Sequence, residues 1–160
     1  MRSRHAGGSS LSRQQADPRS RSPVGEKDTS FGMPDSAPFD KLTDARGVTA
    51  VLRRGFFDRE ANRGFGWDKV WNQHKITNTN AVSYMVRNPN GGSAQGTKRV
   101  YFAYANRVEC GVINCTVREV VRTRTVVEFK YFPTYYGYSV GGQPGVLTAY
   151  CDNYNPECPS

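Results

Sequence analysis

An aromatic run with helical spacing constrains the fold of this chain most strongly. The members that share one face, at positions i, i+3, i+4 and i+7, are Trp67, Val70, Trp71 and His74. We therefore expect a helix from about Trp67 to Lys75 that packs through its tryptophans and carries the His74 imidazole inward. An imidazole in that place can serve as a catalytic base. The same placement also suits a histidine held at a helix C-terminus by packing and by the helix dipole.

Other hydrophobic patterns complete the predicted secondary structure. Lys41 to Arg54 indicates a short helix that ends before Gly55, and Thr77 to Asn80 indicates a stop after the second helix. Beyond that stop the hydrophobic period changes to two, which predicts strands. The predicted strands cover residues 82–86, 98–107, 116–132 and 146–151, with a loop over 133–145. Periodicity leaves open whether 116–132 is one bent strand or two.

The predicted order of elements defines an α+β fold class. N-terminal helices would pack on one face of a twisted antiparallel sheet of four to five strands. Residues 1–42 are rich in Gly, Ser, Pro and Arg, and only Phe31 and Phe39 of the nineteen aromatic residues precede Phe56. Such a segment buries too little apolar surface to offset its chain entropy. We expect a flexible leader or linker over 1–42 and one folded domain over 43–160.

The charge balance favours a polyanionic partner. The formal net charge is +8, and between Val51 and Ser160 fourteen Lys and Arg residues accompany eight Asp and Glu residues. A basic, tyrosine-rich surface attracts nucleic acid, although a soluble basic domain without such a partner can have the same charge. No stretch of the sequence is long and apolar enough to predict a membrane-spanning helix.

The four cysteines fall into two close pairs, Cys110 with Cys115 and Cys151 with Cys158. Each pair brackets a short loop beside a predicted strand, so we expect two local disulfides. A four-thiolate zinc site is the alternative, but zinc ribbons usually have tighter Cys-x2-Cys knuckles. Disulfides indicate an exported protein. Because the N-terminus has no apolar signal core, we expect export as the end of a larger polypeptide.

Two predicted strands carry side chains suited to phosphate. Arg118, Arg122 and Arg124 occupy even positions and so lie on one side of their strand, where the guanidiniums repel one another unless an anion lies across them. A strand with one solvated face has the same pattern. In the last strand, Thr148 and Tyr150 place two hydroxyls on one face. That pair suits a phosphate, although Thr and Tyr are common strand residues.

These side chains are suited to cleavage of RNA without a metal ion. The sequence has no cluster of metal ligands, no Gly-rich phosphate loop after a strand and no Ser-His-Asp arrangement. In RNA the neighbouring 2′-hydroxyl is the nucleophile. An enzyme then needs a base that works near neutral pH and cationic or hydroxyl groups around the phosphorane. We expect His74 to be that base, a 2′,3′-cyclic phosphate to be the product, and no cofactor.

The helix Gly64 to His74, followed by a strand-rich half that ends in Val146 to Cys151, resembles the C-terminal toxin domains of bacterial polymorphic and contact-dependent toxins. Among these the chain is most similar to the ribonuclease group that includes barnase, EndoU, colicin D and RelE. The resemblance spans about Phe56 to Cys158. It implies N-terminal helices on a twisted antiparallel sheet, and metal-free cleavage of RNA, often tRNA.

The resemblance also implies roles for single residues. His74 matches the catalytic histidine of the group, and Thr148 and Tyr150 match the phosphate-binding hydroxyls of its last strand. Lys69 and Lys75 flank the base as cations do in the colicin D type. EndoU enzymes use two histidines, whereas His74 is the only histidine of the expected domain. The second proton donor must then be a Tyr, Lys or Arg side chain.

A toxin of this kind implies several partners. They are an RNA substrate, an acidic cognate immunity protein that covers the His74 cleft, and a larger toxin polypeptide or a secretion system for delivery. The domain would be secreted and would act in the cytoplasm of the target cell.

Two other functions fit parts of the pattern. An ADP-ribosyltransferase toxin would need a catalytic glutamate, for which Glu119 and Glu128 lie inside strand patterns. A secreted RNA-binding module without catalysis would use Tyr and Arg for stacking and phosphate contacts.

Overall fold

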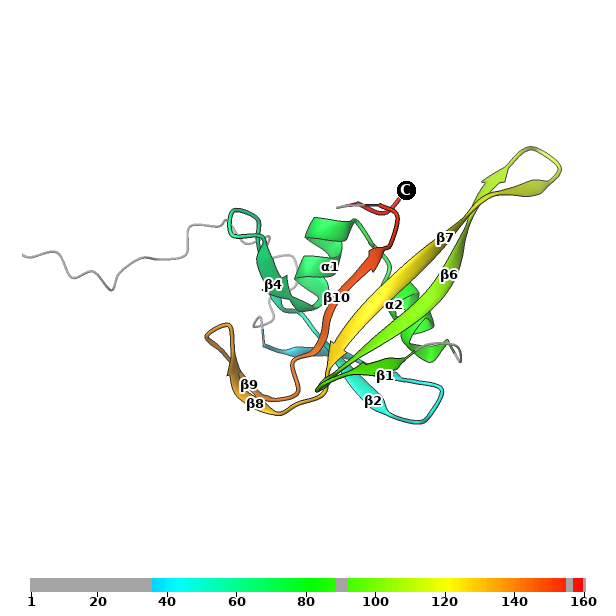
Figure 1. Ribbon diagram of the computed structural model, residues 1–160. Coiled ribbons are helices and arrows are strands. Elements are labelled where there is room, and N and C mark those ends of the chain that lie inside the picture. Colours follow the sequence, from blue (N-terminus) through cyan, green and yellow to red (C-terminus); the bar gives the residue numbers. More distant parts are fainter. Residues whose placement is uncertain (1–35, 89–91, 155–156, 160) are drawn as a thin grey trace, which may run out of the picture.

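The computed structural model describes residues 36–88, 92–154 and 157–159 (Figure 1). Along the described chain, four strands come first, two helices follow, and six strands come last. In chain order the elements are β1 (Pro38–Thr43), β2 (Thr49–Arg53), β3 (Phe56–Asp58), β4 (Arg63–Phe65), α1 (Gly66–His74), α2 (Thr79–Arg87), β5 (Ser93–Gln95), β6 (Lys98–Cys110), β7 (Cys115–Glu128), β8 (Phe132–Tyr135), β9 (Tyr138–Gly142) and β10 (Gly145–Cys151).

The predicted fold class, α+β with N-terminal helices on a sheet of four to five strands, is wrong. The described residues are mainly β, with 53% strand and 15% helix, and the helices lie in the middle of the chain. One antiparallel sheet has the strand order β10-β7-β6-β5, and the other described strands form three two-stranded sheets, β1-β2, β3-β4 and β8-β9. The helix predicted over Trp67 to Lys75 is confirmed as α1.

A hairpin replaces the helix predicted over Lys41 to Arg54. Asp44 and Gly47 close the turn between β1 and β2, with the Gly47 N–H donating to the Asp44 carbonyl (3.0 Å). Gly47 has a φ of 80°, which glycine adopts without strain. The buried apolar side chains of the hairpin are Leu42, Ala50 and Leu52, and Ala50 and Leu52 are two residues apart on β2. The apolar positions that suggested one helical face therefore belong to two strands paired across a turn.

The leader predicted over residues 1–42 overlaps this hairpin. β1 begins at Pro38, and its Leu42 is fully buried in the core. Residues 1–35 lie outside the described residues, so the leader remains a prediction over that range.

Asp44 also fastens the hairpin to the four-stranded sheet. Its carboxylate, which is 2% exposed, accepts hydrogen bonds from the backbone N–H groups of Arg46 and Val48 (both 2.9 Å). It also accepts from the Tyr101 hydroxyl (3.0 Å) and from Arg99 Nη1 (3.1 Å) on β6. Burial would raise the pKa of Asp44, but these donors together hold it below the ordinary value for aspartate. The buried charge is thus fully compensated.

A helix replaces the strand predicted over 82–86. Asn78 caps the N-terminus of α2, because its side-chain oxygen accepts a hydrogen bond from the Asn80 N–H (2.9 Å). The buried residues of α2 have helical spacing and are Val82, Met85 and Val86. Tyr84, which a strand would place beside the two valines, is 54% exposed. Thr77 to Asn80 therefore starts a new helix as well as ending α1.

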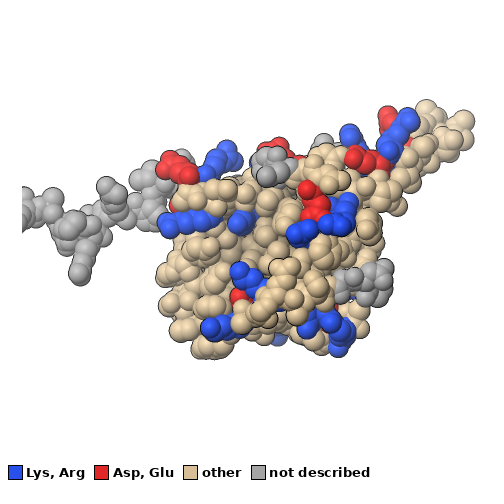
Figure 2. Space-filling view, in the orientation of Figure 1, with Lys and Arg blue, Asp and Glu red and all other residues tan. Residues whose placement is uncertain are grey.

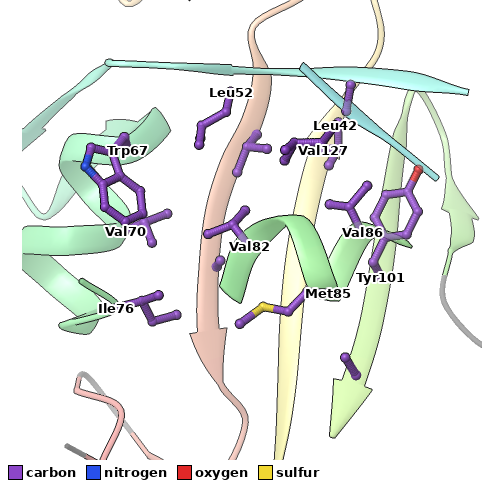
Figure 3. Packing of buried hydrophobic residues seen from close by; sticks show 14 residues of the cluster. Leu42, Leu52, Trp67, Val70, Ile76, Val82, Met85, Val86, Tyr101 and Val127 are labelled. Carbon is purple, nitrogen blue, oxygen red and sulfur yellow. The ribbon is translucent and has the colours of Figure 1, made fainter. Parts of the chain in front are cut away.

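The core lies on one face of the four-stranded sheet. In Figure 1, α2 lies behind this sheet, and Figure 3 shows Val82, Met85 and Val86 of α2 directed toward the strands. Leu42 and Leu52 reach the same core from the β1–β2 hairpin, and Trp67 and Val70 reach it from α1. Because α1 packs mainly on the edge strand β10, its last turn lies beside that strand.

β6 and β7 extend beyond the sheet as a long two-stranded arm (Figure 1). They pair from Lys98 and Glu128 to Cys110 and Cys115. The prediction over 98–107 is confirmed, and the stretch 116–132 contains one long strand that ends at Glu128. The expected loop over 133–145 holds the β8–β9 hairpin instead. Figure 2 shows no charged side chains at the far end of the arm.

Three glycines let separate backbone segments approach closely. All three have positive φ angles, between 71° and 78°. A Cβ atom added at Gly55 would lie 1.8 Å from the Phe65 carbonyl oxygen. One added at Gly66 would lie 2.7 Å from the Arg53 carbonyl oxygen, and one added at Gly145 would lie 1.8 Å from the Val51 carbonyl oxygen. These contacts join the end of β2 to the start of α1 and to the start of β10.

The same close approach supplies a hydrogen-bond acceptor for the N-terminus of α1. Phe65 is the N-cap residue and offers no side-chain acceptor. The Arg54 carbonyl accepts the hydrogen bond from the Asp68 N–H instead (2.8 Å). The helix therefore begins where the preceding chain supplies a backbone acceptor.

We predict that Gly55→Ala destabilises the protein by roughly 3 kcal/mol, from left-handed backbone strain and the clash with Phe65. Gly47→Ala is the matched control, because Gly47 has a similar φ of 80° and no atom within 4 Å of the added Cβ. It should cost only about 1 kcal/mol. Urea unfolding measures both. Equal losses for the two variants would contradict the close-approach explanation.

Candidate functional site

A cleft of about 360 Å³ lies between α1 and β10, beside the residues that follow β10. Four of its lining residues were predicted from the sequence to take part in catalysis or substrate binding, and they are His74, Thr148, Tyr150 and Lys69. Lys69 and His74 lie on α1, whereas Thr148 and Tyr150 lie on β10, far along the sequence. The packing of α1 on β10 brings them together. This cleft is the candidate functional site.

His74 lines the cleft and is nearly buried. It is the last residue of α1 and is 7% exposed. Its backbone carbonyl accepts a hydrogen bond from the Cys158 N–H (2.9 Å), and its ring centroid lies 5.5 Å from that of Tyr150. Trp67 and Val70 are buried as the helical spacing predicted, whereas Trp71 is 38% exposed. The inward placement of His74 is thus confirmed.

Two polar atoms in the cleft have no hydrogen-bond partner among the described residues. They are the Thr148 hydroxyl and the side-chain carbonyl oxygen of Gln73, and both are screened from solvent. The pairing register of β10 with β7 shifts between Val146 and Thr148, and such a bulge changes the direction of a side chain. Buried polar groups normally have partners, and two of the three unsatisfied buried side-chain atoms of the described residues belong to residues that line this cleft.

Lys69 is half-buried in the same cleft. Burial lowers the pKa of its ammonium group below the ordinary value for lysine. Among the described residues no carboxylate forms an ion pair with it. An uncompensated, partly desolvated lysine is a costly feature for a purely structural surface and is typical of sites that bind anions or transfer protons.

Of the three arginines predicted as one row, Arg122 and Arg124 lie together and Arg118 lies apart from them. Arg122 and Arg124 both form ion pairs with Asp152, just after β10, and this carboxylate raises the pKa of Arg122. Arg124 Nε lies 2.9 Å from Asp152 Oδ1, outside hydrogen-bond geometry, so that contact is ionic. Arg118 lies farther along the arm beside a bulge in the β6–β7 pairing and is paired with Glu109.

Lys75 does not line the cleft. It caps the C-terminus of α1 with a φ of 57° and borders a neighbouring hollow of about 460 Å³. Its ammonium group lies 4.0 Å from Glu157. Lys75 therefore belongs to the neighbouring hollow, and its charge is partly compensated by Glu157.

Three lining residues were missed in the sequence. Gln73 lies beside His74 on the predicted helix, and its proximity could have suggested it. Asp152 and Tyr154 follow the last strand, and their side chains turn back to Arg122 and to Glu119. No local pattern reveals such long-range pairs.

Both predicted disulfides are confirmed. Cys110 is bonded to Cys115 at the end of the arm, and Cys151 to Cys158 beside the cleft. The second disulfide holds the segment whose Cys158 N–H binds the His74 carbonyl. In the described part of the chain, no group of three or more His, Cys, Asp and Glu residues is placed to hold a metal ion. None of the described helices is long and apolar enough to cross a membrane.

Comparison of the chain with protein-family models, with curated proteins and with solved structures finds no match. The resemblance to toxin domains therefore has only the sequence motifs as support. Any function has to be argued from the cleft itself.

We predict that replacing Cys151 and Cys158 by serine shifts the NMR signal of the His74 imidazole, because the segment that binds the end of α1 is released. The matched control is the pair Cys110→Ser and Cys115→Ser at the far end of the arm. Each double variant should lose roughly 2 kcal/mol of stability, but only the first should move the His74 signal. An unchanged His74 signal in both would contradict the role of this disulfide.

Proposed function

We propose that the chain is a metal-independent endoribonuclease, with tRNA among its candidate substrates. The observation that carries the proposal is the single cleft that contains His74, Lys69 and the unpartnered hydroxyl of Thr148. A base, a cation and a hydroxyl donor are the groups that transesterification at phosphorus requires. The net charge of +8 favours an anionic substrate.

The proposed reaction uses the 2′-hydroxyl of the substrate. His74 takes the proton from this hydroxyl, and the 2′-oxygen forms a bond to phosphorus. Thr148 and Tyr150 donate hydrogen bonds to the phosphorane oxygens, whose negative charge grows in the transition state. The bond from phosphorus to the 5′-oxygen then breaks. The products are a 2′,3′-cyclic phosphate and a free 5′-hydroxyl.

The leaving 5′-oxygen needs a proton, and we assign Lys69 as the donor. The cleft offers the Lys69 ammonium and the Tyr150 hydroxyl for this step. Burial lowers the pKa of Lys69, which makes its ammonium a stronger acid than an ordinary lysine and a better general acid near neutral pH.

The proposal includes the biological setting of a toxin. Two disulfides are consistent with an extracellular protein. Delivery as part of a larger toxin polypeptide and action in the cytoplasm of a target cell belong to the proposal. So does an acidic immunity protein, whose carboxylates would approach Lys69 and Lys75 and would compete with Asp152 for Arg122 and Arg124. Its association should slow as salt rises.

We predict that the protein cleaves total RNA in the presence of EDTA and that His74→Ala lowers the rate about 10²- to 10⁴-fold. Asn72→Ala is the control on the same helix, because Asn72 is exposed and does not line the cleft. It should keep the wild-type rate, and thermal unfolding checks that both variants are folded.

Three other results would overturn the ribonuclease proposal. They are a wild-type rate in His74→Ala, consumption of NAD by an ADP-ribosyltransferase, and protection of RNA without cleavage by a binding module.

A second prediction concerns the role of Lys69. A guanidinium keeps its proton, so Lys69→Arg should preserve the charge yet lose about 10²-fold or more in cleavage rate. In the wild type the rate should fall as pH rises through the lowered pKa of Lys69, because the donor is then deprotonated. Lys75→Arg is the control and should keep both rate and pH profile. A Lys69→Arg enzyme with the wild-type rate and profile would exclude Lys69 as the donor.

A further inference from the structure

Aromatic and arginine side chains alternate on one face of the sheet next to the cleft. Tyr150 of β10 is paired with Arg124 of β7, and Arg124 is paired with Phe102 of β6. Two residues farther toward the arm on these strands, Arg122 is paired with Tyr104. Residues that are directly paired, or two apart along a strand, share a face. These five residues, Tyr150, Arg124, Phe102, Arg122 and Tyr104, are called the stacking row below.

The stacking row lies on the open face of the sheet. α2 packs on the other face, where its Met85 sulfur accepts a hydrogen bond from Thr125 of β7 (3.1 Å). Thr125 is adjacent to Arg124 on β7, so the two side chains point to opposite faces, and the stacking row therefore lies on the face away from α2. Among the described elements, α2 is the one outside the sheet that packs extensively on β6 and β7. Tyr104 is accordingly 59% exposed, and the Arg122 side chain is 45% exposed.

Both guanidiniums of the row lie over aromatic rings of the row. The Arg122 and Arg124 guanidinium carbons lie 5.1 Å and 4.9 Å from the centre of the Phe102 ring. Arg124 also lies 5.8 Å from the centre of the Tyr150 ring. Asp152 is the one carboxylate paired with the two arginines among the described residues, so the row keeps a net positive charge.

These properties match unpaired nucleotides. Nucleobases stack on aromatic rings and on guanidinium planes, and the phosphates between them meet the remaining positive charge. Adjacent strands are about 4.8 Å apart, so the row extends about 10 Å from β10 to β6. That length accommodates roughly two nucleotides. In a double helix the bases are already stacked on one another and cannot lie on this surface.

We propose that the stacking row is a subsite for single-stranded nucleotides that flank the phosphate in the His74 cleft. Tyr150 belongs to both the row and the cleft lining, so a strand bound on the row leads directly to the cleft. This inference rests on the proposed ribonuclease function for the identity of the substrate. It adds that the substrate is single-stranded at the cleavage site.

The test measures binding of the full chain to a fluorescent eight-nucleotide DNA strand, which lacks the 2′-hydroxyl and cannot be cleaved by the proposed reaction. Loss of one stacking partner should raise Kd about five-fold or more. Tyr104→Ala should show this loss without affecting the fold, because Tyr104 is exposed. Tyr131→Ala is the matched control, since Tyr131 is 64% exposed and lies outside the row. It should leave Kd unchanged.

The outcomes separate this inference from the proposed function. Equal Kd values for wild type and Tyr104→Ala, absence of binding, or equal binding of the strand and its duplex would each overturn the subsite. RNA cleavage is measured separately on the same proteins. If the wild type cleaves no RNA but Tyr104→Ala weakens binding of the strand, the subsite stands and the ribonuclease fails.

Discussion

The close approach of three backbone segments at Gly55, Gly66 and Gly145 is the constraint on which the rest of the structure depends. Each position combines a positive φ with a neighbouring carbonyl that leaves no room for a Cβ atom. The contacts place the start of α1 and the start of β10 on the same hairpin strand, β2. From that common origin the two elements run side by side. The cleft between them, with His74 and Thr148, is a consequence of this crossing.

The sequence predicts local elements well where one periodicity stands alone. α1 was predicted because its apolar residues have helical spacing, and the strand over 98–107 was predicted because Val100, Phe102 and Tyr104 recur with a period of two. For 116–132, periodicity did not distinguish one strand from two, and the pairing of β6 with β7 is seen only in the fold. The helix expected near Asp44 failed because a carboxylate that accepts turn N–H groups and a Gly at positive φ create a hairpin inside a short apolar run. The strand expected at 82–86 failed because Val82 and Val86 fit both periods, and only the burial of Met85 decides.

The candidate site was predictable in part. His74 and Thr148 were chosen for their chemistry and Lys69 from the resemblance to toxin domains, and the fold brings all three to one cleft. Strand parity grouped Arg118 with the other arginines, but a bulge beside Arg118 breaks that parity. The ion pairs of Asp152 form because β10 pairs with β7 and places Asp152 beside Arg122 and Arg124. No local sequence pattern indicates this pairing. Residue types therefore indicate which chemistry a site can perform, whereas the partners that compensate each charge can be identified only from the folded structure.

The chemistry of the RNA ends tests the central claim most directly. An RNA cut by the wild-type protein would first be mapped, and the same RNA would then carry one 2′-deoxynucleotide immediately 5′ of the cleaved phosphate. We expect 2′,3′-cyclic phosphate and 5′-hydroxyl ends on the natural RNA and no cleavage at the substituted position, because the 2′-oxygen is the nucleophile. Cleavage at the deoxy position, or fragments with 3′-hydroxyl and 5′-phosphate ends, would contradict a mechanism in which His74 activates the 2′-hydroxyl.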